Sequence, residues 1–497
     1  MSNNSALVRG LTLQEELAAL GGEDLEVNRH AQRIFDTAIE GLNIDTNSAV
    51  SVVLDKVFRD EGIEKQFFNA GIRLTTMRGR VAKKVLELIG EDSKKIGIMA
   101  IGDVRLPPFA NTVARDIVAR SHQIHQAIFD NRGASYDLAS RGLPMARRRL
   151  MAYLDTYYGF TDVDETLLQK MAQNSCLTSG GMRGLDDIMT GISQLAKRNR
   201  ENAAPEFVLR EFHPDNSFGT WGAIADLRTN SGLTGKVRTV PTSAKNGLHL
   251  TADDVRKAYE NIDRSADFQD TWCITPVGNP SGTAMLPDQL NSVVATVLEN
   301  SPNAVVVLDS TYVRTLPVQK AKALMAAVMS DANLLKRIVF VDSFSKTHGL
   351  CGERLGLFFS ANEDLFSSIH RVNLTLSAGN GLSKDALALA ISDTNPMREA
   401  VFTKLHRFWA KERAGLYQHL IGDKKYSDLF EEEQAHLDPS QLEESLGLYL
   451  FLKLKPGITG QEVLLRTGCL GVETKMASGN YLRFAVGEIT EPTYARV

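Results

Sequence analysis

An apolar strand that runs directly into a polar loop is the feature that most restricts how this chain can fold. Residues 337–341 are Arg-Ile-Val-Phe-Val, and the loop behind them brings two serines and a lysine, Lys346, before the first glycine, Gly349. A short apolar run bounded by turn residues is typical of a strand inside a parallel sheet, because helices cover both of its faces. The run therefore favours an α/β protein that presents Lys346 just beyond the carboxyl end of a buried strand.

The polar residues around Lys346 suit one kind of ligand, a phosphorylated aldehyde. A primary amine captures an aldehyde covalently, so one lysine has to be held at fixed geometry. The hydroxyls of Ser343 and Ser345 and the planar guanidinium of Arg354 provide hydrogen-bond donors for a phosphate dianion. The run indicates a covalent site for pyridoxal 5'-phosphate (PLP). For this segment alone, the alternative is a solvated loop behind a strand.

A second apolar strand, residues 305–308, ends in a carboxylate. Asp309 follows it directly, and Tyr312 comes three residues later. A carboxylate at the end of a central strand can pair with the protonated ring nitrogen of PLP and keep the ring an effective electron sink. Considered alone, Asp309 is better explained as a helix cap or a turn residue, because Asp-Ser-Thr favours both.

Two glycine-containing turns precede this strand. Ser179, Gly180 and Gly181 lie between an apolar stretch and a helical pattern, where backbone amides and the helix dipole attract an anion. They are candidates for a second phosphate contact. The later turn, Asn-Pro-Ser-Gly, begins at Asn279. Either turn alone is common loop chemistry, and a plain loop is the alternative for both.

Near the other end of the sequence, residues 480–487 form a short apolar-rich strand with a single arginine, Arg483. A guanidinium binds a planar carboxylate through two parallel hydrogen bonds. Arg483 is therefore the candidate for binding a substrate carboxylate, and the alternative is a surface arginine.

In their order along the chain, these five elements resemble the motifs of the class I and II aminotransferase family, which are fold type I PLP enzymes, over residues 96–497. The resemblance implies that Lys346 is the Schiff-base lysine, with Asp309 and Tyr312 as its catalytic partners. It also implies that Arg483 and Asn279 bind the substrate, and that Asn279 and Tyr312 hydrogen-bond the ring oxygen of the cofactor. The cofactor-binding residues that it implies among these elements are Ser179, Gly180, Gly181, Asn279, Asp309, Tyr312, Ser343, Ser345, Lys346 and Arg354.

Two aromatic positions depart from the family pattern. The family stacks a ring on the cofactor after a Pro-x-aromatic turn, but the turn at Pro214 has Asn216 at that spacing. Phe218 is the candidate for this cofactor contact, and Trp221 is the next nearest ring. Tyr136 resembles the tyrosine that reaches the cofactor phosphate of a neighbouring subunit, with one extra residue before its Gly-Leu-Pro. Ordinary packing is the alternative for each ring.

At 497 residues the chain exceeds the size that a single core usually serves. Alternating strand and helix patterns predict a large PLP-binding domain with a mostly parallel sheet over residues 96–370. A smaller α+β domain is expected over residues 371–497, with strands at residues 447–454 and 481–486. Residues 1–95 have amphipathic helical patterns and carry 13 basic and 15 acidic residues. We expect a helical extension there that clasps a dimer or covers the pocket, rather than a nucleic-acid arm.

The composition argues against several other classes of protein. A net charge of -4, with no long apolar run and no signal peptide, favours a soluble cytoplasmic protein without nucleic-acid or membrane partners. The four cysteines have no paired spacing and the ten histidines do not cluster, so we expect neither a disulfide scaffold nor a metal site. The family resemblance adds the expectation of a homodimer.

The leading functional hypothesis is an aminotransferase of amino acid metabolism and biosynthesis, in which Lys346 moves a proton at the substrate α-carbon. A second hypothesis keeps the site and changes the reaction to that of a lyase, a decarboxylase, or a replacement or carbon–carbon bond-forming enzyme, including chemistry on S-adenosylmethionine. A more remote hypothesis is a non-catalytic PLP-binding regulator. The sequence does not identify the substrate side chain.

Overall fold

The computed structural model describes residues 97–99, 104, 106–133, 141–198, 208–217, 236–260, 262, 268–377, 381–393, 396–438 and 448–488. The chain divides into two compact units, a larger one of residues 102–458 and 473–492 and a smaller one of residues 1–101, 459–472 and 493–497. The domain boundaries expected near residues 95 and 370 stay predictions. The helical extension expected over residues 1–95 lies outside the described residues.

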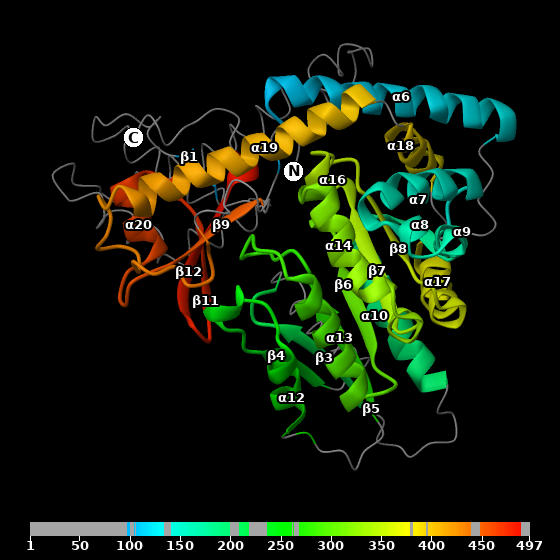
Figure 1. Cartoon of the computed structure of the whole chain (residues 1–497). Helices are drawn as coiled ribbons and strands as arrows, with labels where there is room; N and C mark the ends of the chain where they lie inside the picture. Colours follow the sequence, from blue (N-terminus) through cyan, green and yellow to red (C-terminus); the bar gives the residue numbers. More distant parts are fainter. Residues whose placement is uncertain are drawn as a thin grey trace, which may run out of the picture. The chain divides into compact units, whose positions relative to one another are not determined.

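A seven-stranded sheet forms the framework of the larger unit (Figure 1). Its strand order is β2-β8-β7-β6-β5-β3-β4, and the neighbours from β7 to β4 pair in parallel, whereas β8 is antiparallel to both β2 and β7. The predicted α/β class with a mostly parallel sheet is confirmed. The strands are β2 (Ser175–Ser179), β3 (Val208–Pro214), β4 (Lys236–Val240), β5 (Phe268–Ile274), β6 (Val305–Asp309), β7 (Ile338–Ser343) and β8 (Leu355–Phe359).

Helices cover both faces of the central strands, which explains why β6 and β7 are apolar almost throughout. Alternate valines of these two strands pack in one core with residues of α10 (Gly181–Arg198) and α17 (Glu363–Ser377). The residues between them are also buried, and they point to the opposite face because strand side chains alternate. Helices α13 (Pro287–Asn300) and α14 (Val318–Met329) lie on that face (Figure 1).

The other helices of the larger unit surround this framework, and α6 runs beside α18 and part of α19 (Figure 1). Apart from short 3-10 and π turns, those among the described residues are α6 (Pro108–Arg132), α7 (Pro144–Tyr158), α8 (Phe160–Val163), α9 (Glu165–Gln173), α12 (Ala252–Glu260), α15 (Ala332–Leu335), α16 (Phe344–Thr347), α18 (Leu382–Ser392) and α19 (Pro396–Tyr417).

A three-stranded sheet forms the second part of the larger unit, in the order β11 (Val472–Met476), β12 (Gly479–Ala485), β9 (Tyr449–Lys453). Strands β9 and β12 pair antiparallel, with Arg483 opposite Phe451. The sequence places strands at residues 447–454 and 481–486, in agreement with β9 and β12. In the smaller unit, β1 (Gly97–Ile98) pairs in parallel with β10 (Cys469–Leu470), which follows α20 (Gly460–Thr467).

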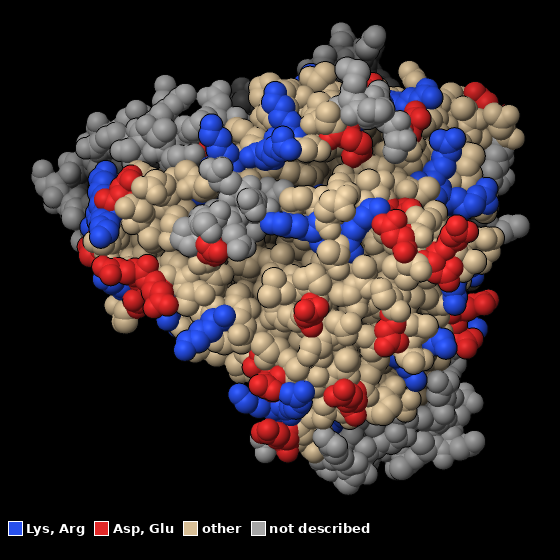
Figure 2. Space-filling view, viewed as in Figure 1, with Lys and Arg blue, Asp and Glu red and all other residues tan. Residues whose placement is uncertain are grey.

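Three further observations on the described residues concern membrane spans, metal-binding groups and cysteines. None of their helices combines the length and the apolar character that a membrane span requires. They include no group of three or more His, Cys, Asp or Glu side chains that could hold a metal ion, and the four cysteines are free thiols. On the face shown in Figure 2, basic and acidic side chains are interspersed over the described surface.

Candidate active site

Four of the predicted site segments meet at the carboxyl ends of parallel strands. The glycine turn follows β2, the turn of Asn279 follows β5, Asp309 ends β6 and Ser343 ends β7. Ligands of open α/β sheets bind at this edge, because the loops that leave the strands there carry the functional side chains. The fold thus gathers residues that lie far apart in the sequence.

Lys346 lies in the short helix α16, which begins directly after β7. The Ser343 side chain caps this helix, because its Oγ accepts a hydrogen bond from the Ser345 backbone amide at 3.3 Å. The Lys346 Nζ is 3.8 Å from the Cys351 Sγ, and that thiol donates to the Ser345 carbonyl oxygen at 2.9 Å. The partly buried amine of Lys346 therefore lies on a short helix that Ser343 caps and that Cys351 of the following loop contacts.

The glycine turn forms a cradle with two hydroxyls and a guanidinium. Gly180 has a φ of +85°, and a Cβ on it would lie 2.6 Å from the Arg354 Nη2. A Cβ on Gly181 would lie 3.3 Å from the Ser343 Cβ and 3.6 Å from the Thr311 Oγ1. Helix α10 begins at Gly181, so its free amides are close to these donors. These donors fit a phosphate group. Larger side chains at Gly180 and Gly181 would occupy the space that the phosphate needs.

Asp309 is a buried carboxylate, 6% exposed, that accepts a hydrogen bond from the Thr311 amide at 3.1 Å. Burial raises the pKa of Asp309 to about 6, hydrogen bonds from Thr311 oppose that change, and the negative charge of Asp342 adds to it. A desolvated carboxylate beside a like charge is stabilised by a cation. The protonated ring nitrogen of PLP is such a cation, so the residues present fit the cofactor at this end as well.

A hydrogen-bonded chain links the cofactor side of the site to Arg483. The Asn279 Nδ2 donates to the Tyr312 hydroxyl at 3.1 Å, and Arg483 Nη1 donates to the Asn279 Oδ1 at 3.0 Å. The Tyr312 hydroxyl is also 2.9 Å from that of Tyr449. Burial, with contributions from Tyr449 and Asp309, raises the pKa of Tyr312 well above its usual range, so its phenol is protonated at neutral pH. The predicted strand arginine thus joins the predicted ring-binding pair.

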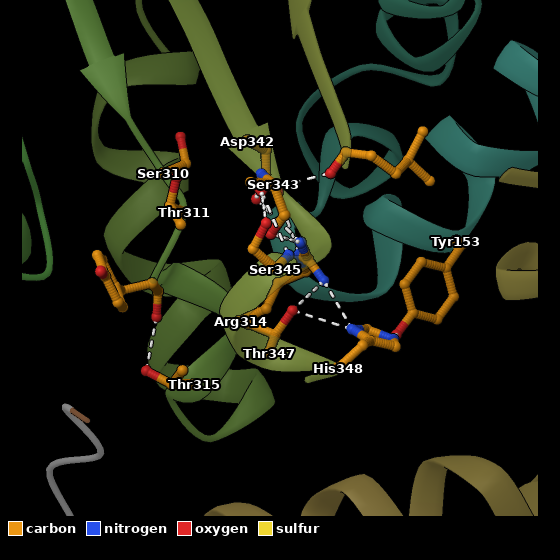
Figure 3. Close-up of polar contacts among 12 residues, drawn as sticks. Tyr153, Ser310, Thr311, Arg314, Thr315, Asp342, Ser343, Ser345, Thr347 and His348 are labelled. Atoms are coloured by element: carbon orange, nitrogen blue, oxygen red, sulfur yellow. Dashed lines mark hydrogen bonds and ion pairs between the residues drawn. The ribbon is translucent and has the colours of Figure 1, made fainter. Parts of the chain in front are cut away.

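A buried ion pair lies behind the lysine loop (Figure 3). The Arg314 Nη2 is 2.9 Å from the Asp342 Oδ1, and its Nε donates to Oδ2 at 3.1 Å. Arg314 also donates to the Thr347 Oγ1 at 2.8 Å and to the Ser343 carbonyl oxygen at 2.9 Å. The guanidinium carbon lies 4.1 Å from the centre of the Phe344 ring. One side chain therefore contacts both ends of α16 and holds the turn that carries the lysine.

His348 extends this buried network toward α7. Its Nε2 is 3.1 Å from the Tyr153 hydroxyl, and its Nδ1 is 2.9 Å from the Thr347 Oγ1 (Figure 3). Burial and the nearby positive charge of Arg314 lower the pKa of His348 well below its usual range, so the ring is neutral at physiological pH. Its ring centre is 4.3 Å from that of Phe402. These contacts give His348 a packing role, consistent with a residue that supports the loop.

Some of the residues predicted from the sequence lie outside the described part of the chain, and others lie within it. Tyr136, Phe218 and Trp221 lie outside the described residues, so their roles stay predictions. Ser179 ends β2 with an exposed side chain, next to the cradle. Asn216 is buried and donates from its Nδ2 to the Leu248 carbonyl oxygen at 2.6 Å. This bond gives Asn216 a structural role at the position where the family carries its stacking ring.

Sequence reasoning missed four residues of the site. Two of them could have been recognised from the sequence. Thr311 lies between the predicted residues Asp309 and Tyr312, and Asp342 is a carboxylate at the end of a predicted strand. Arg314 lies two residues after Tyr312 but carries no pattern of its own. Tyr449 belongs to a predicted strand, and only the pairing of β9 with β12 brings it to the site.

Comparison with known proteins extends these observations. The family model described as aminotransferase class I and II matches residues 219–434. That range contains the Asn-Pro turn, the strand of Asp309 and the lysine loop, but not the glycine turn or Arg483.

Curated relatives include two plant enzymes. The chain is 27% identical over 154 residues to 1-aminocyclopropane-1-carboxylate synthase 2 of Solanum lycopersicum, a match that covers 30% of each chain. It is 28% identical over 152 residues to 1-aminocyclopropane-1-carboxylate synthase 2 of Arabidopsis thaliana, again over 30% of each chain. The match spans about 30% of the length of these relatives.

Solved structures with the same fold include two aminotransferases. The aspartate aminotransferase of Rhizobium meliloti has a TM-score of 0.61 at 13% identity, covering 84% of this chain and 93% of that one. The aromatic aminotransferase of Pyrococcus horikoshii OT3 has a TM-score of 0.59 at 15% identity, covering 80% and 92%. The predicted family, fold type and cofactor are confirmed. By the match over residues 219–434 and by its fold, the chain is similar to the class I and II aminotransferases of fold type I, whose cofactor is pyridoxal 5'-phosphate.

Proposed function

We propose that this chain acts at the α-carbon of an amino acid and that its reaction is transfer of the amino group to a 2-oxo acid. The observation that supports this most directly is the 3.0 Å hydrogen bond between Arg483 and Asn279. It joins a carboxylate-binding guanidinium to the Asn279–Tyr312 pair. Groups suited to a substrate carboxylate and to a cofactor ring are thereby part of one connected arrangement.

The proposal assigns a role to each group. Bound PLP supplies an electron sink that makes the α-hydrogen of an amino acid acidic. Asp309 stabilises positive charge on the ring nitrogen, and the Lys346 Nζ takes and returns a proton at the α-carbon. Arg483 binds and orients the substrate carboxylate. Tyr312 and Asn279 donate hydrogen bonds to the ring oxygen of the cofactor. The glycine turn, Ser343, Ser345 and Arg354 hold the phosphate, with Thr311 beside them.

An amino-exchange assay tests the leading reaction. Protein reconstituted with PLP is incubated with single amino acids and an isotopically labelled 2-oxo acid, and mass spectrometry detects the labelled amino acid that forms. We expect Lys346→Ala to abolish the product, whereas Lys336→Ala, at an exposed lysine after α15, leaves it unchanged. Failure of every amino acid to exchange would contradict aminotransfer.

A second reaction is favoured by a specific observation, the similarity to two 1-aminocyclopropane-1-carboxylate synthases. In this alternative the same site removes the α-proton of S-adenosylmethionine. The α-carbon then forms a bond to the γ-carbon as the sulfonium leaves, and the amino group stays on the product. Lys346 again moves the proton, and Arg483 again binds the carboxylate.

One incubation separates the two reactions. S-adenosylmethionine is supplied as the only amino compound, and the products are analysed for 1-aminocyclopropane-1-carboxylate and for the methylthio-nucleoside that leaves with it. Their formation in equal amounts, without a 2-oxo acid, supports the second reaction and contradicts obligatory aminotransfer. Formation of neither, together with amino exchange from another donor, supports the first.

We further propose that the protein works as a cytoplasmic homodimer. The family resemblance of Tyr136 to a tyrosine that crosses between subunits supports a shared site, and the helical patterning of residues 1–95 supports a dimer clasp. Deletion of residues 1–90 is expected to reduce the mass measured by light scattering to that of one chain. An unchanged dimer with normal turnover would contradict the clasp.

A further inference from the structure

Tyr449 is a buried tyrosine that contacts both Tyr312 and Arg483. It begins β9 and is 2% exposed, and its ring centre lies 5.7 Å from that of Tyr312 at an interplanar angle of 66°. The guanidinium carbon of Arg483 lies 4.8 Å from the centre of the Tyr449 ring. A Cβ on Gly282 would lie 2.1 Å from the Tyr449 carbonyl oxygen, so the Asn-Pro-Ser-Gly turn packs directly on its backbone.

The hydroxyl of Tyr449 has a specific partner. It is 2.9 Å from the Tyr312 hydroxyl, and either oxygen can be the donor. The Tyr312 oxygen already accepts a hydrogen bond from the Asn279 Nδ2 at 3.1 Å. A phenol has one proton to donate and two lone pairs to accept with. Tyr312 can therefore donate to the ring oxygen of PLP only when Tyr449 donates to Tyr312.

We propose that Tyr449 is a positioning residue of the active site, whose hydroxyl donates to Tyr312 and so directs the single proton of Tyr312 toward the cofactor. This proposal rests on the assignment of Tyr312 to the ring oxygen within the proposed function. A donor that itself accepts hydrogen bonds is polarised and donates more strongly. Asn279 and Tyr449 together make Tyr312 a stronger donor than an isolated phenol.

The test uses Tyr449→Phe, which keeps the ring beside Arg483 and removes only the hydroxyl. The visible absorbance of the bound cofactor is titrated with pH, because the cofactor ring oxygen and the Lys346 nitrogen share a proton. Weaker donation from Tyr312 favours the protonated form, so we expect the midpoint to rise by about half to one pH unit. We expect kcat to fall about 3- to 10-fold, the range for loss of one hydrogen bond.

Tyr481→Phe is the matched control. Tyr481 lies on the neighbouring strand β12, is fully buried, and bonds through its hydroxyl to the Ser478 Oγ at 3.1 Å. This variant makes the same chemical change in the same small sheet without contact to Tyr312. We expect its midpoint to equal that of the unmodified protein, and an equal midpoint in Tyr449→Phe would overturn the proposal.

A double variant tests whether Tyr449 acts through Tyr312. The midpoint of Tyr312→Phe/Tyr449→Phe is expected to equal that of Tyr312→Phe alone, because the second hydroxyl has then lost its partner. Additive shifts would contradict the proposal. The titration requires only bound cofactor, so it gives a result even if neither proposed reaction is observed. Absence of amino exchange would count against the proposed function alone.

Discussion

Asp309 and Asp342 lie at the ends of adjacent parallel strands, yet different groups surround their carboxylates. They are 6% and 0% exposed. Asp342 forms a bidentate ion pair with Arg314, whereas Asp309 has hydrogen bonds from Thr311 and a like charge nearby. A buried carboxylate with its own cation positions the backbone around it. A buried carboxylate such as Asp309, which has a second carboxylate nearby, is suited to binding a cationic ligand.

The largest expected effect separates the two carboxylates by activity. Asp309→Asn is expected to lower kcat by on the order of 10²- to 10³-fold, because the uncharged amide stabilises positive charge on the cofactor ring poorly. The variant is expected to stay folded, and kcat is measured after reconstitution with PLP, with bound cofactor quantified by absorbance. A variant with normal kcat and full cofactor would show that Asp309 does not face the ring.

The ion pair is tested by stability. Arg314→Met is expected to destabilise the protein by about 3 to 5 kcal/mol, because it leaves Asp342 buried without its cation. Urea unfolding of the cofactor-free protein measures the change. The double variant Arg314→Met/Asp342→Leu removes both charges, and we expect it to regain most of the loss. If the single and double variants lose equal stability, the charge of Asp342 is not the cause.

The pH dependence of stability sharpens the comparison. The folded pKa of Asp309 is raised from 3.8 to about 6, so its contribution to stability is fully present below pH 3.8 and is lost as the pH rises through about 6. The loss amounts to about 3 kcal/mol at most. Asp309→Asn is expected to remove this dependence and make the cofactor-free protein more stable near pH 7. Unfolding of both proteins between pH 4 and 7 tests this, and equal slopes would contradict it.

The smallest expected effect concerns Cys351, in the loop between α16 and β8. The thiol of Cys351 is 3.8 Å from the Lys346 Nζ, and a thiol is a weak donor and a weak acceptor. Cys351→Ala is expected to change kcat by about 2-fold or less. Steady-state kinetics measures it. A loss of 10-fold or more would give the thiol a role in holding the lysine that its geometry does not indicate.

Much of the fold followed from local patterns. The apolar runs that form β6 and β7 are continuous because both of their faces are buried, and that property can be recognised in the sequence. The helical extension and the domain boundaries remain predictions. Sequence gave no basis for the antiparallel direction of β8, because strand direction depends on pairing with distant segments.

The residues of the site divide in the same way. Lys346, Asp309 and Asn279 are identifiable because each lies in a short motif with its own chemistry. Tyr449 and Arg314 have no such motif: one depends on the register of β9 with β12, and the other on a contact across 28 residues. Contacts between residues far apart in the sequence therefore determine the positions of Tyr449 and Arg314 in the site.

The sequence by itself determined the fold class, and it predicted the reactive amine and the order of the groups that accompany it. Those features depend on apolar periodicity and on the chemistry of neighbouring side chains, both of which are local. Only the tertiary structure decided which buried carboxylate has a cation and which tyrosine contacts Tyr312. Desolvation and hydrogen-bond direction depend on every segment packed around a group, and in this protein those segments come from different strands and both sheets of the larger unit.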